Sequence, residues 1–388
     1  MRFLVLFNGQ VHPNSGAGGT VWQTNRALTE LGHEVELLTA DHIRRRIGHY
    51  SMHDAFELPY RVLEAVCERL ARGVFDVLLI SQPYGYRLGQ WVRAERSRGR
   101  RAPVYLHRSH GHELVAAAQM AALRDQLPRD GRPTWRRWST RALARRLAWQ
   151  AREALRVADG TIVPSEFDRD FLLRREGADA ARVRTIHHAP LDEYLAAPPA
   201  PYTPERHRQV LYVGNVTNIK GASVLPAAIG EAFGRFADAR LTVVAPAGDH
   251  GRLRDTLASA LLRRVTFVDW VDQSQLMELY DRHGVQVVPS FYEGASKAHY
   301  EGMSRGLCMV CSAVGAMKDS IVDGVNGLLA SPGDAHGFAT QLTRALADPA
   351  AAADMAAAAR KTACRYTWRR TAEEIVDFAR CCAPEARA

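Results

Sequence analysis

The sequence contains 388 residues, more than the roughly 250–300 that one hydrophobic core usually organises, so we expect two domains. Hydrophobic residues account for 47% of the chain and charged residues for 24%, which excludes an intrinsically disordered or collagen-like protein. No run of about 18 uncharged apolar residues is present, and the start of the chain turns polar too early for a signal peptide. We therefore expect a cytoplasmic protein without a transmembrane anchor.

The formal net charge is +9, yet only four of the 51 basic residues are lysines, so a lysine at a motif position is less easily a chance occurrence. The six cysteines lack the spacing of a metal cluster, since only Cys308 and Cys311 form a CxxC pair, and that pair lies in an apolar run. We expect buried thiols there, and neither a zinc site nor a disulfide.

Apolar and β-branched segments alternate with helical stretches along the chain, a pattern typical of parallel sheets covered on both faces. In the first half the predicted strands are residues 3–7, 34–39, 76–81, 103–107 and 160–164. In the second half they are residues 209–214, 240–245, 265–268, 285–290, 309–313 and 327–330. Two successive series predict an α/β fold made of two Rossmann-like domains.

The stretch between the two series, residues 190–208, holds five of the 18 prolines. Proline removes a backbone donor and restricts the residue before it, so this stretch is predicted to be an extended linker. The predicted domains are accordingly residues 1–195 and 196–365. An alanine-rich helix is expected after Pro349, and an amphipathic helix over residues 366–380 ends the chain.

The most basic stretch, residues 124–156, interleaves arginines with Trp135, Trp138 and Trp149. A basic amphipathic helix of this kind can lie on an anionic membrane surface. The stronger interpretation is a helix that covers a sheet and turns an arginine-rich face to water. Nucleic-acid binding is disfavoured because no recognition motif accompanies the charge.

Two strand ends of the first half carry candidate ligand-binding residues. Gly16, Gly18 and Gly19 open the helix after the first strand, where glycines let backbone N–H groups approach an anion. The spacing is not GxGxxG, so a nicotinamide cofactor is disfavoured. The segment His107–Glu113 follows the fourth strand and contains three histidines, one of which can orient or deprotonate a hydroxyl. A purely structural role at a helix entrance stays open for them.

In the second half, Lys220 follows the first strand at the expected start of a helix, where its charge and the helix N-terminus suit a diphosphate. After the strand at 285–290, Glu293 is expected in a loop, with Lys297 and Glu301 in the following helix. A carboxylate accepts two hydroxyl hydrogen bonds, so such a pair suits the vicinal diols of a sugar and of a ribose.

In order and spacing, these segments resemble the retaining glycosyltransferases of family 4 (glycosyl transferases group 1), which have the GT-B fold. Glu293, seven residues and Glu301, followed by AVGAMKDSIVDGVNGLL, resemble the family's C-terminal domain. VGNVTNIKG is similar to its phosphate-binding segment, SGAGGTVWQTNRALTELG to its N-terminal glycine loop, and RSHGHE to its histidine motif. The resemblance implies two parallel sheets that face an interdomain cleft, with a C-terminal helix that joins the N-terminal domain.

The resemblance also implies roles for individual residues. Lys220 would neutralise the diphosphate of a UDP- or GDP-sugar donor, Glu301 would hold the ribose, and Glu293 would hold the sugar. Backbone amides of Gly294, Ala295 and Ser296 would assist, His110 would lie near the transferring carbon, and Gly18 and Gly19 would approach the diphosphate or the acceptor. The family's arginine is Asn215 here, which leaves room for Lys297 to substitute as a donor contact.

On this resemblance we expect a sugar transferase of the EC 2.4 type that retains anomeric configuration and acts in glycan or exopolysaccharide assembly. No DxD-type metal motif is positioned at a predicted strand end, so neither a metal nor another cofactor is expected. The acceptor, whether a glycan, a lipid-linked sugar or a small molecule, is not readable from the sequence. The alternatives are a non-hydrolysing nucleotide-sugar epimerase and a non-catalytic nucleotide-sugar-binding subunit.

Overall fold

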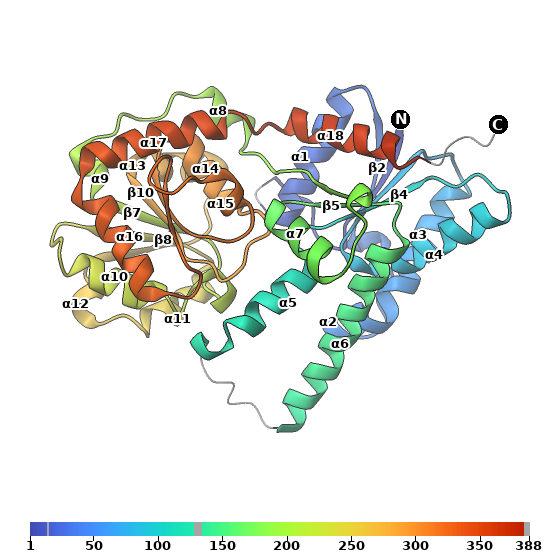
Figure 1. Ribbon diagram of the computed structural model, residues 1–388, viewed down its shortest axis with the longest axis horizontal. Coiled ribbons are helices and arrows are strands. Elements are labelled where there is room, and N and C mark those ends of the chain that lie inside the picture. Colours follow the sequence, from blue (N-terminus) through green and yellow to red (C-terminus); the bar gives the residue numbers. More distant parts are fainter. Residues whose placement is uncertain (14, 128–133, 384–388) are drawn as a thin grey trace. The chain divides into compact units, whose positions relative to one another are not determined.

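A computed structural model describes residues 1–13, 15–127 and 134–383 (Figure 1). The chain divides into two compact units. Unit 1 comprises the described residues of Met1–Val115, Arg129–His187 and Trp368–Ala388, and unit 2 those of Ala116–Pro128 and His188–Thr367. Within the described residues, no helix combines the length and the apolar character needed to cross a membrane.

Unit 1 is built on a six-stranded parallel sheet with the order β2-β1-β3-β4-β5-β6. Its strands are β1 (Arg2–Leu6), β2 (Glu34–Leu38), β3 (Val77–Ser81), β4 (Val104–Arg108), β5 (Gly160–Val163) and β6 (Val183–Thr185). Its helices are α1 (Ala17–Glu30), α2 (Tyr50–Met52), α3 (Leu58–Leu70), α4 (Tyr86–Ser97), α5 (Glu113–Ala122), which continues into unit 2, α6 (Thr134–Val157), α7 (Glu166–Arg175) and α18 (Trp368–Cys381). Every residue of β3 and β4 is buried, as expected for central strands covered on both faces.

Unit 2 repeats this plan with the strand order β12-β11-β10-β7-β8-β9, again all parallel. The strands are β7 (Gln209–Val213), β8 (Arg240–Val244), β9 (Val265–Val268), β10 (Val285–Val288), β11 (Cys308–Ser312) and β12 (Leu328–Ala330). The helices are α8 (Asp192–Ala196), α9 (Pro204–His207), α10 (Leu225–Phe233), α11 (His250–Arg254), α12 (Ser259–Leu262), α13 (Gln273–Arg282), α14 (Lys297–Ser304), α15 (Gly315–Ser320), α16 (Ala335–Ala347) and α17 (Pro349–Ala363).

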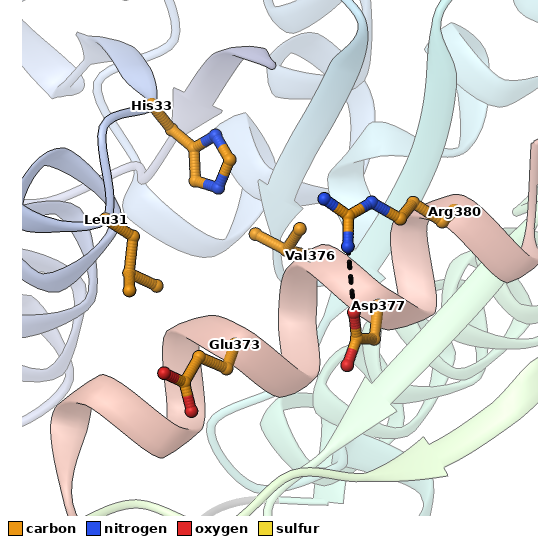
Figure 2. A pocket seen from close by; sticks show the side chains of 6 residues that line it. All are labelled: Leu31, His33, Glu373, Val376, Asp377 and Arg380. Atoms are coloured by element: carbon orange, nitrogen blue, oxygen red, sulfur yellow. Dashed lines mark hydrogen bonds and ion pairs between the residues drawn. The ribbon is translucent and has the colours of Figure 1, made fainter.

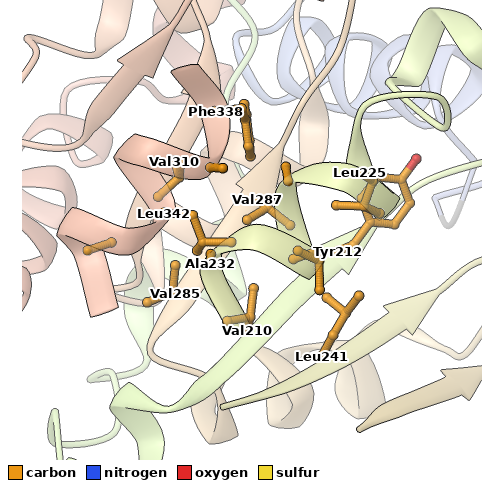
Figure 3. Close-up of a cluster of buried hydrophobic side chains, with 14 of the residues drawn as sticks. Val210, Tyr212, Leu225, Ala232, Leu241, Val285, Val287, Val310, Phe338 and Leu342 are labelled. Carbon is orange, nitrogen blue, oxygen red and sulfur yellow. The ribbon is translucent and has the colours of Figure 1, made fainter. Parts of the chain in front are cut away.

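The core of unit 2 shows why these segments form a sheet with covering helices. Leu225 and Ala232 of α10, together with Phe338 and Leu342 of α16, pack on Val210, Tyr212, Leu241, Val285, Val287 and Val310 of the strands (Figure 3). Burying each of the valine, leucine and phenylalanine side chains among them contributes roughly 1.5–3 kcal/mol. Cys308 and Cys311 lie in the buried strand β11, and all six cysteines have free thiols.

The eleven predicted strands are present, and the two-domain α/β fold is confirmed. The structure adds β6, an edge strand of only three residues. The predicted boundary was wrong at its edges. Residues 188–195 belong to unit 2, where Leu191 and Tyr194 are buried, and so do residues 116–127, because Met120, Leu123 and Leu127 pack on its core.

The proline-rich stretch 190–208 is also not the extended linker that we predicted. It contains α8 and α9, and it is held on unit 2 by arginine side chains that donate to its carbonyl groups. Arg305 donates to the carbonyls of Tyr194, Ala197 and Pro198 at 2.9–3.2 Å, and Arg360 to those of Leu195 and Ala197 at 3.1 and 3.3 Å. Proline removes N–H donors but leaves acceptors, and guanidinium groups satisfy these.

Candidate functional site

In each sheet, the strand order reverses next to the first strand of the series, between β1 and β3 in unit 1 and between β7 and β10 in unit 2. Open α/β sheets bind ligands beyond the carboxyl ends of the strands at such a point. In unit 2, the loops after β7 and β10 meet there, and the Phe291 amide donates to the Ile219 carbonyl at 2.9 Å. The predicted donor residues of unit 2 all lie on these two loops or on α14, whereas Gly18 and Gly19 lie in unit 1.

Lys220 does not begin a helix, contrary to our expectation. It ends a short 3₁₀ turn, Asn218–Lys220, and α10 begins later, at Leu225. Gly221 then adopts a left-handed conformation with φ of 82°, and a Cβ atom there would lie 2.1 Å from the Pro289 carbonyl oxygen. Glycine at this position therefore allows the two loops to approach, which sets the direction of Lys220.

The Lys220 ammonium group forms an ion pair with Oε1 of Glu293. The same oxygen accepts a hydrogen bond from the Ser290 hydroxyl at 3.3 Å. Glu293 is buried, with 7% of its surface exposed, whereas the Lys220 side chain keeps 33% exposed. The buried Glu293 carboxylate therefore holds the Lys220 side chain in place, while part of that side chain stays exposed to solvent.

The loop Glu293–Ser296 is packed against the start of α15. Gly315 has a φ of 51°, a Cβ atom there would collide with the Glu293 carbonyl oxygen, and the Ala316 amide donates to the Gly294 carbonyl at 2.9 Å. Ala295 is half-buried, and Ser296 is the N-cap of α14 without a side-chain capping bond. The loop is therefore held at a helix N-terminus, which favours negative charge.

Glu301 lies in α14, as predicted, and is 3% exposed. Its Oε2 accepts a hydrogen bond from the Tyr280 hydroxyl at 3.1 Å, and its Oε1 lies 3.6 Å from the Lys297 ammonium nitrogen. Burial and the Glu301 charge raise the pKa of Tyr280, so this hydroxyl stays a donor. Oε1 itself is buried and accepts no hydrogen bond, which leaves it ready to accept one from a ligand hydroxyl.

Asn215, where the resembled family has arginine, is exposed, and its backbone carbonyl accepts a hydrogen bond from the Tyr212 hydroxyl at 2.8 Å. The two lysines of the site are each paired with a different carboxylate, Lys220 with Glu293 and Lys297 with Glu301. The structure thus brings the predicted donor residues of unit 2 together as two ion pairs on neighbouring elements.

In unit 1, Gly18 and Gly19 lie in the first turn of α1 and are buried. A Cβ atom on Gly18 would lie 2.1 Å from the Gln10 carbonyl oxygen, so glycine is required for the loop to fold back on the helix start. This packing explains Gly18 without a ligand, and a ligand role for both glycines stays a prediction.

His110 lies just beyond β4 and reaches the strand ends beside it. Its Nε2 is 3.2 Å from the Ser81 hydroxyl of β3, and its ring meets the edge of Phe7, after β1, at a centroid distance of 5.7 Å. These contacts place His110 at the reversal point of the unit 1 sheet. The predicted position at a strand end is therefore correct.

Burial keeps the histidines of this segment neutral. It lowers the pKa of His107 to about 4 and, with the charge of His107, that of His112 to about 3. Burial, together with the charges of Arg108 and His107, lowers the pKa of His110 well below its usual value. At neutral pH, His110 is therefore an uncharged group that both donates and accepts hydrogen bonds. Burial conversely raises the pKa of Glu113 to about 7.

Three residues of the unit 2 site were missed by sequence reasoning, namely Tyr280, Ser290 and Gly315. Gly315 had a signal, because a glycine between a strand and a helix often marks a close backbone approach. Tyr280 had none, since it lies in α13, far along the chain from Glu301. Among the described residues, no group of three or more His, Cys, Asp or Glu side chains is arranged to hold a metal ion.

A separate pocket in unit 1 is lined by Leu31, His33, Glu373, Val376, Asp377 and Arg380 (Figure 2). His33 directly precedes β2, and its Nδ1 lies 3.1 Å from the N-terminal amine. The pocket therefore opens at the amino ends of the strands, the edge opposite to the one that binds ligands in this fold class. We do not assign it to the candidate site.

Two family profiles match the chain. The profile "Glycosyltransferase Family 4" matches residues 14–189, and "Glycosyl transferases group 1" matches residues 207–348. D-inositol 3-phosphate glycosyltransferase 2 of Catenulispora acidiphila is 29% identical over 237 residues, which cover 57% of this chain and 56% of the relative. Glycogen synthase of Mycobacterium tuberculosis is 27% identical over 229 residues, or 58% of this chain and 54% of the relative. The matched part thus spans about half the length of these relatives.

Solved structures resemble the chain over almost its whole length. Sucrose-phosphate synthase from Thermosynechococcus elongatus has a TM-score of 0.71 at 22% identity, with 98% of both chains covered. Anabaena HepE, solved with UDP and glucose, has a TM-score of 0.67 at 16% identity, with 97% of this chain and 98% of HepE covered. At these identities, the likeness establishes the GT-B fold.

Proposed function

The chain belongs to glycosyltransferase family 4, and from this premise we propose that it moves a sugar from a UDP- or GDP-sugar to an acceptor hydroxyl with retention of anomeric configuration. The family and the relatives support a transferase of the EC 2.4 type. HepE, solved with UDP and glucose, supports a nucleotide-sugar donor.

The observation that carries the proposal is the pair of lysine–carboxylate contacts at the carboxyl ends of β7 and β10. In the proposed complex, the Lys220 ammonium group binds the diphosphate of the nucleotide sugar. The backbone amides of Gly294–Ser296 supply further hydrogen bonds. The carboxylate of Glu293 then turns to the sugar hydroxyls, and Oε1 of Glu301 accepts a hydrogen bond from the ribose. Lys297 compensates the loss of the arginine that Asn215 replaces.

Catalysis in this proposal is electrostatic. As the bond between the sugar and the diphosphate breaks, negative charge develops on the leaving oxygen, and a preorganised cation and helix-end amides stabilise it. One such donor is typically worth about 10²–10³ in rate. Lys220 supplies the charge without a metal ion, so we propose that the reaction is metal-independent. His110, being neutral, positions the acceptor or the sugar near the transferring carbon by hydrogen bonding.

The proposal is tested with a panel of nucleotide sugars by following release of the nucleoside diphosphate. We expect slow release without acceptor and faster release with the correct one, in the presence of a chelator. A non-hydrolysing epimerase would change the sugar of the donor without releasing the nucleoside diphosphate. A binding subunit would gain thermal stability from a nucleotide sugar but would show no turnover. Either result, with no donor giving transfer, would contradict a transferase. An acceptor in glycan or exopolysaccharide assembly is our first choice.

For cellular location we propose a cytoplasmic protein that rests on an anionic membrane through one surface of unit 1, the aromatic–arginine surface. Six of the ten exposed large apolar side chains in the described part of the chain lie on α2, α6 and the segment 53–60. They are Tyr50, Met52, Phe56, Tyr60, Trp138 and Trp149, with 42–64% of their surfaces exposed.

Arginines tie these side chains into one surface. Arg87 donates to the Tyr60 hydroxyl at 2.6 Å and lies over its ring at 4.4 Å, and Arg146 lies over Trp149 at 4.4 Å and over Phe56 at 5.7 Å. Residues 138–145 of α6 are exposed apart from the half-buried Leu143, and this part of the helix projects away from the sheet of unit 1 (Figure 1). Aromatic residues and cations together are the chemistry that enters the headgroup region of anionic bilayers.

Binding to vesicles tests this surface. We expect the protein to sediment with vesicles of phosphatidylcholine and phosphatidylglycerol, less so in high salt, and not with phosphatidylcholine alone. Trp138→Ser should weaken sedimentation, whereas the matched control Trp270→Ser, on an exposed tryptophan of unit 2, should not. Equal binding to both vesicle types, or no effect of Trp138→Ser, would refute the assignment.

A further inference from the structure

Three arginines are almost fully buried in the described chain, and they differ in how their charges are satisfied. Arg305, Arg206 and Arg108 are 1%, 5% and 2% exposed. A buried guanidinium group has five N–H donors and a charge, and removing it from water costs several kcal/mol unless partners compensate. A buried arginine whose partners satisfy its charge therefore has a structural explanation, whereas one without such partners points to another role.

The two buried arginines of unit 2 are saturated with partners. Arg305 forms an ion pair with Asp281 at 2.7 Å and donates to three backbone carbonyls of residues 194–198. Arg206 donates to the carbonyls of His283, Ala200, Tyr280, Arg305 and Gly306. Both hold the stretch 190–208 in place, which is a complete structural explanation.

Arg108 has no such partner. Among the residues that the structure describes, no carboxylate forms an ion pair with its guanidinium group and no oxygen accepts a hydrogen bond from it. The residue ends β4, at the carboxyl edge of the sheet, and its charge acts on the neighbouring His110. An uncompensated cation thus stands beside the histidine that lies where strand order reverses.

We propose that Arg108 binds an oxyanion, a phosphate or carboxylate group, carried by the acceptor. This inference rests on the proposed function and names the substrate class that its acceptor side takes. An arginine fork matches the geometry of both groups, and an incoming anion supplies the missing partner for the charge. The donor diphosphate has its own cations in unit 2, Lys220 and Lys297, which is why we assign Arg108 to the acceptor.

Thermal unfolding at constant ionic strength tests the inference with phosphate and acetate as probes. We expect phosphate, acetate or both to raise the melting temperature of the wild type by a few degrees, and the more effective probe identifies the group. Arg108→Met should abolish this rise. Lys220→Met, which removes the donor cation, and Arg141→Met, on an exposed arginine of α6, should keep it.

The same variants separate a ligand role from a structural one. In chloride buffer, Arg108→Met should melt no lower than the wild type, since it removes an uncompensated buried charge, whereas Arg305→Met should melt well below it. Melting of Arg108→Met as low as Arg305→Met would overturn the inference, as would a wild type that neither anion stabilises. UDP or GDP should still stabilise Arg108→Met. Loss of this stabilisation in Arg108→Met would show that Arg108 binds the nucleotide-sugar donor and not the acceptor. Its absence in the wild type would count against the proposed function.

Discussion

The strand-end sites of the two units handle charge in opposite ways. In unit 2, Lys220 with Glu293 and Lys297 with Glu301 are charges that already have partners. In unit 1, burial keeps His107, His110 and His112 neutral, and the charge of Arg108 is unpaired among the described residues. If both sites bind ligands as we propose, a ligand of unit 2 exchanges one partner for another, whereas an anionic ligand of unit 1 supplies a partner for Arg108.

This difference suggests a division of labour. Paired charges keep side chains in place before a ligand arrives, which suits the stabilisation of a leaving group by preorganised groups. Neutral imidazoles that are shielded from water can hydrogen-bond to a substrate and orient it without placing a charge in the protein interior.

The largest effect is expected for Lys220→Met, which removes the charge and keeps the stem. Because the leaving oxygen loses its cation, turnover should fall by about 10²–10³, measured as release of nucleoside diphosphate from the donor. Lys361→Met is the matched control, since Lys361 is exposed in the last turn of α17. If Lys220→Met and Lys361→Met lowered turnover by the same amount, unit 2 would not stabilise the leaving group through the pair of Lys220 and Glu293.

His110→Ala should act on unit 1 alone. We expect turnover to fall by about 10²-fold with the affinity for UDP or GDP unchanged, because a group that orients reactants contributes to the reaction and not to donor binding. Since the pKa of His110 is lowered well below 6.5, the wild-type rate should show no histidine ionisation between pH 6 and 8. His336→Ala, at an exposed histidine, is the control. Equal turnover in His110→Ala and the wild type would remove His110 from the mechanism.

Sequence patterns were sufficient for the elements of both sites but not for their charge pairing. The eleven predicted strands and the placement of Glu293 and Glu301 follow from local apolar runs and motif spacing. The contact of Tyr280 with Glu301 depends on how α13 packs against α14, which no local pattern encodes. The strand β6 escaped because three residues are too few to show a period.

Buried arginines show the same limit. In a sequence with 51 basic residues, nothing marks Arg206 and Arg305 as anchors of a proline-rich stretch or Arg108 as a buried cation. The prolines of residues 190–208 indicated missing donors correctly. Which groups would satisfy the remaining carbonyls was decided by tertiary packing.

A smaller effect is expected for Glu301→Gln in unit 2. The variant keeps the shape of the side chain and the hydrogen bond to Tyr280 but loses the charge. A hydrogen bond to a charged group is worth roughly 1.5–3 kcal/mol, and part of it survives in the variant. The affinity for UDP or GDP should therefore fall by about tenfold. Calorimetric titration measures the change. Glu278→Gln, at an exposed glutamate of α13, should leave the affinity unchanged. Unaltered affinity in Glu301→Gln would mean that this carboxylate does not hold the nucleotide.

The smallest effect concerns stability in unit 1 and depends on pH. Burial raises the pKa of Glu113 from 4.5 to about 7, so the folded state holds this proton more tightly than the unfolded state. The stability that this confers is present below pH 4.5 and is lost as the pH rises to about 7. Glu113→Gln should therefore melt about 2–5 °C above the wild type at pH 8, with a difference near zero at pH 4.5.

The buried histidines have the opposite dependence, because their lowered pKa values make the protein lose stability as the pH falls from 6.5 towards 4. Both proteins carry these histidines, so their contribution cancels when the melting temperatures are subtracted at each pH. A difference that stays constant between pH 4.5 and 8 would show that Glu113 is solvated. The unit 1 site would then be less dry than its neutral histidines imply, and the contrast with the charged site of unit 2 would weaken.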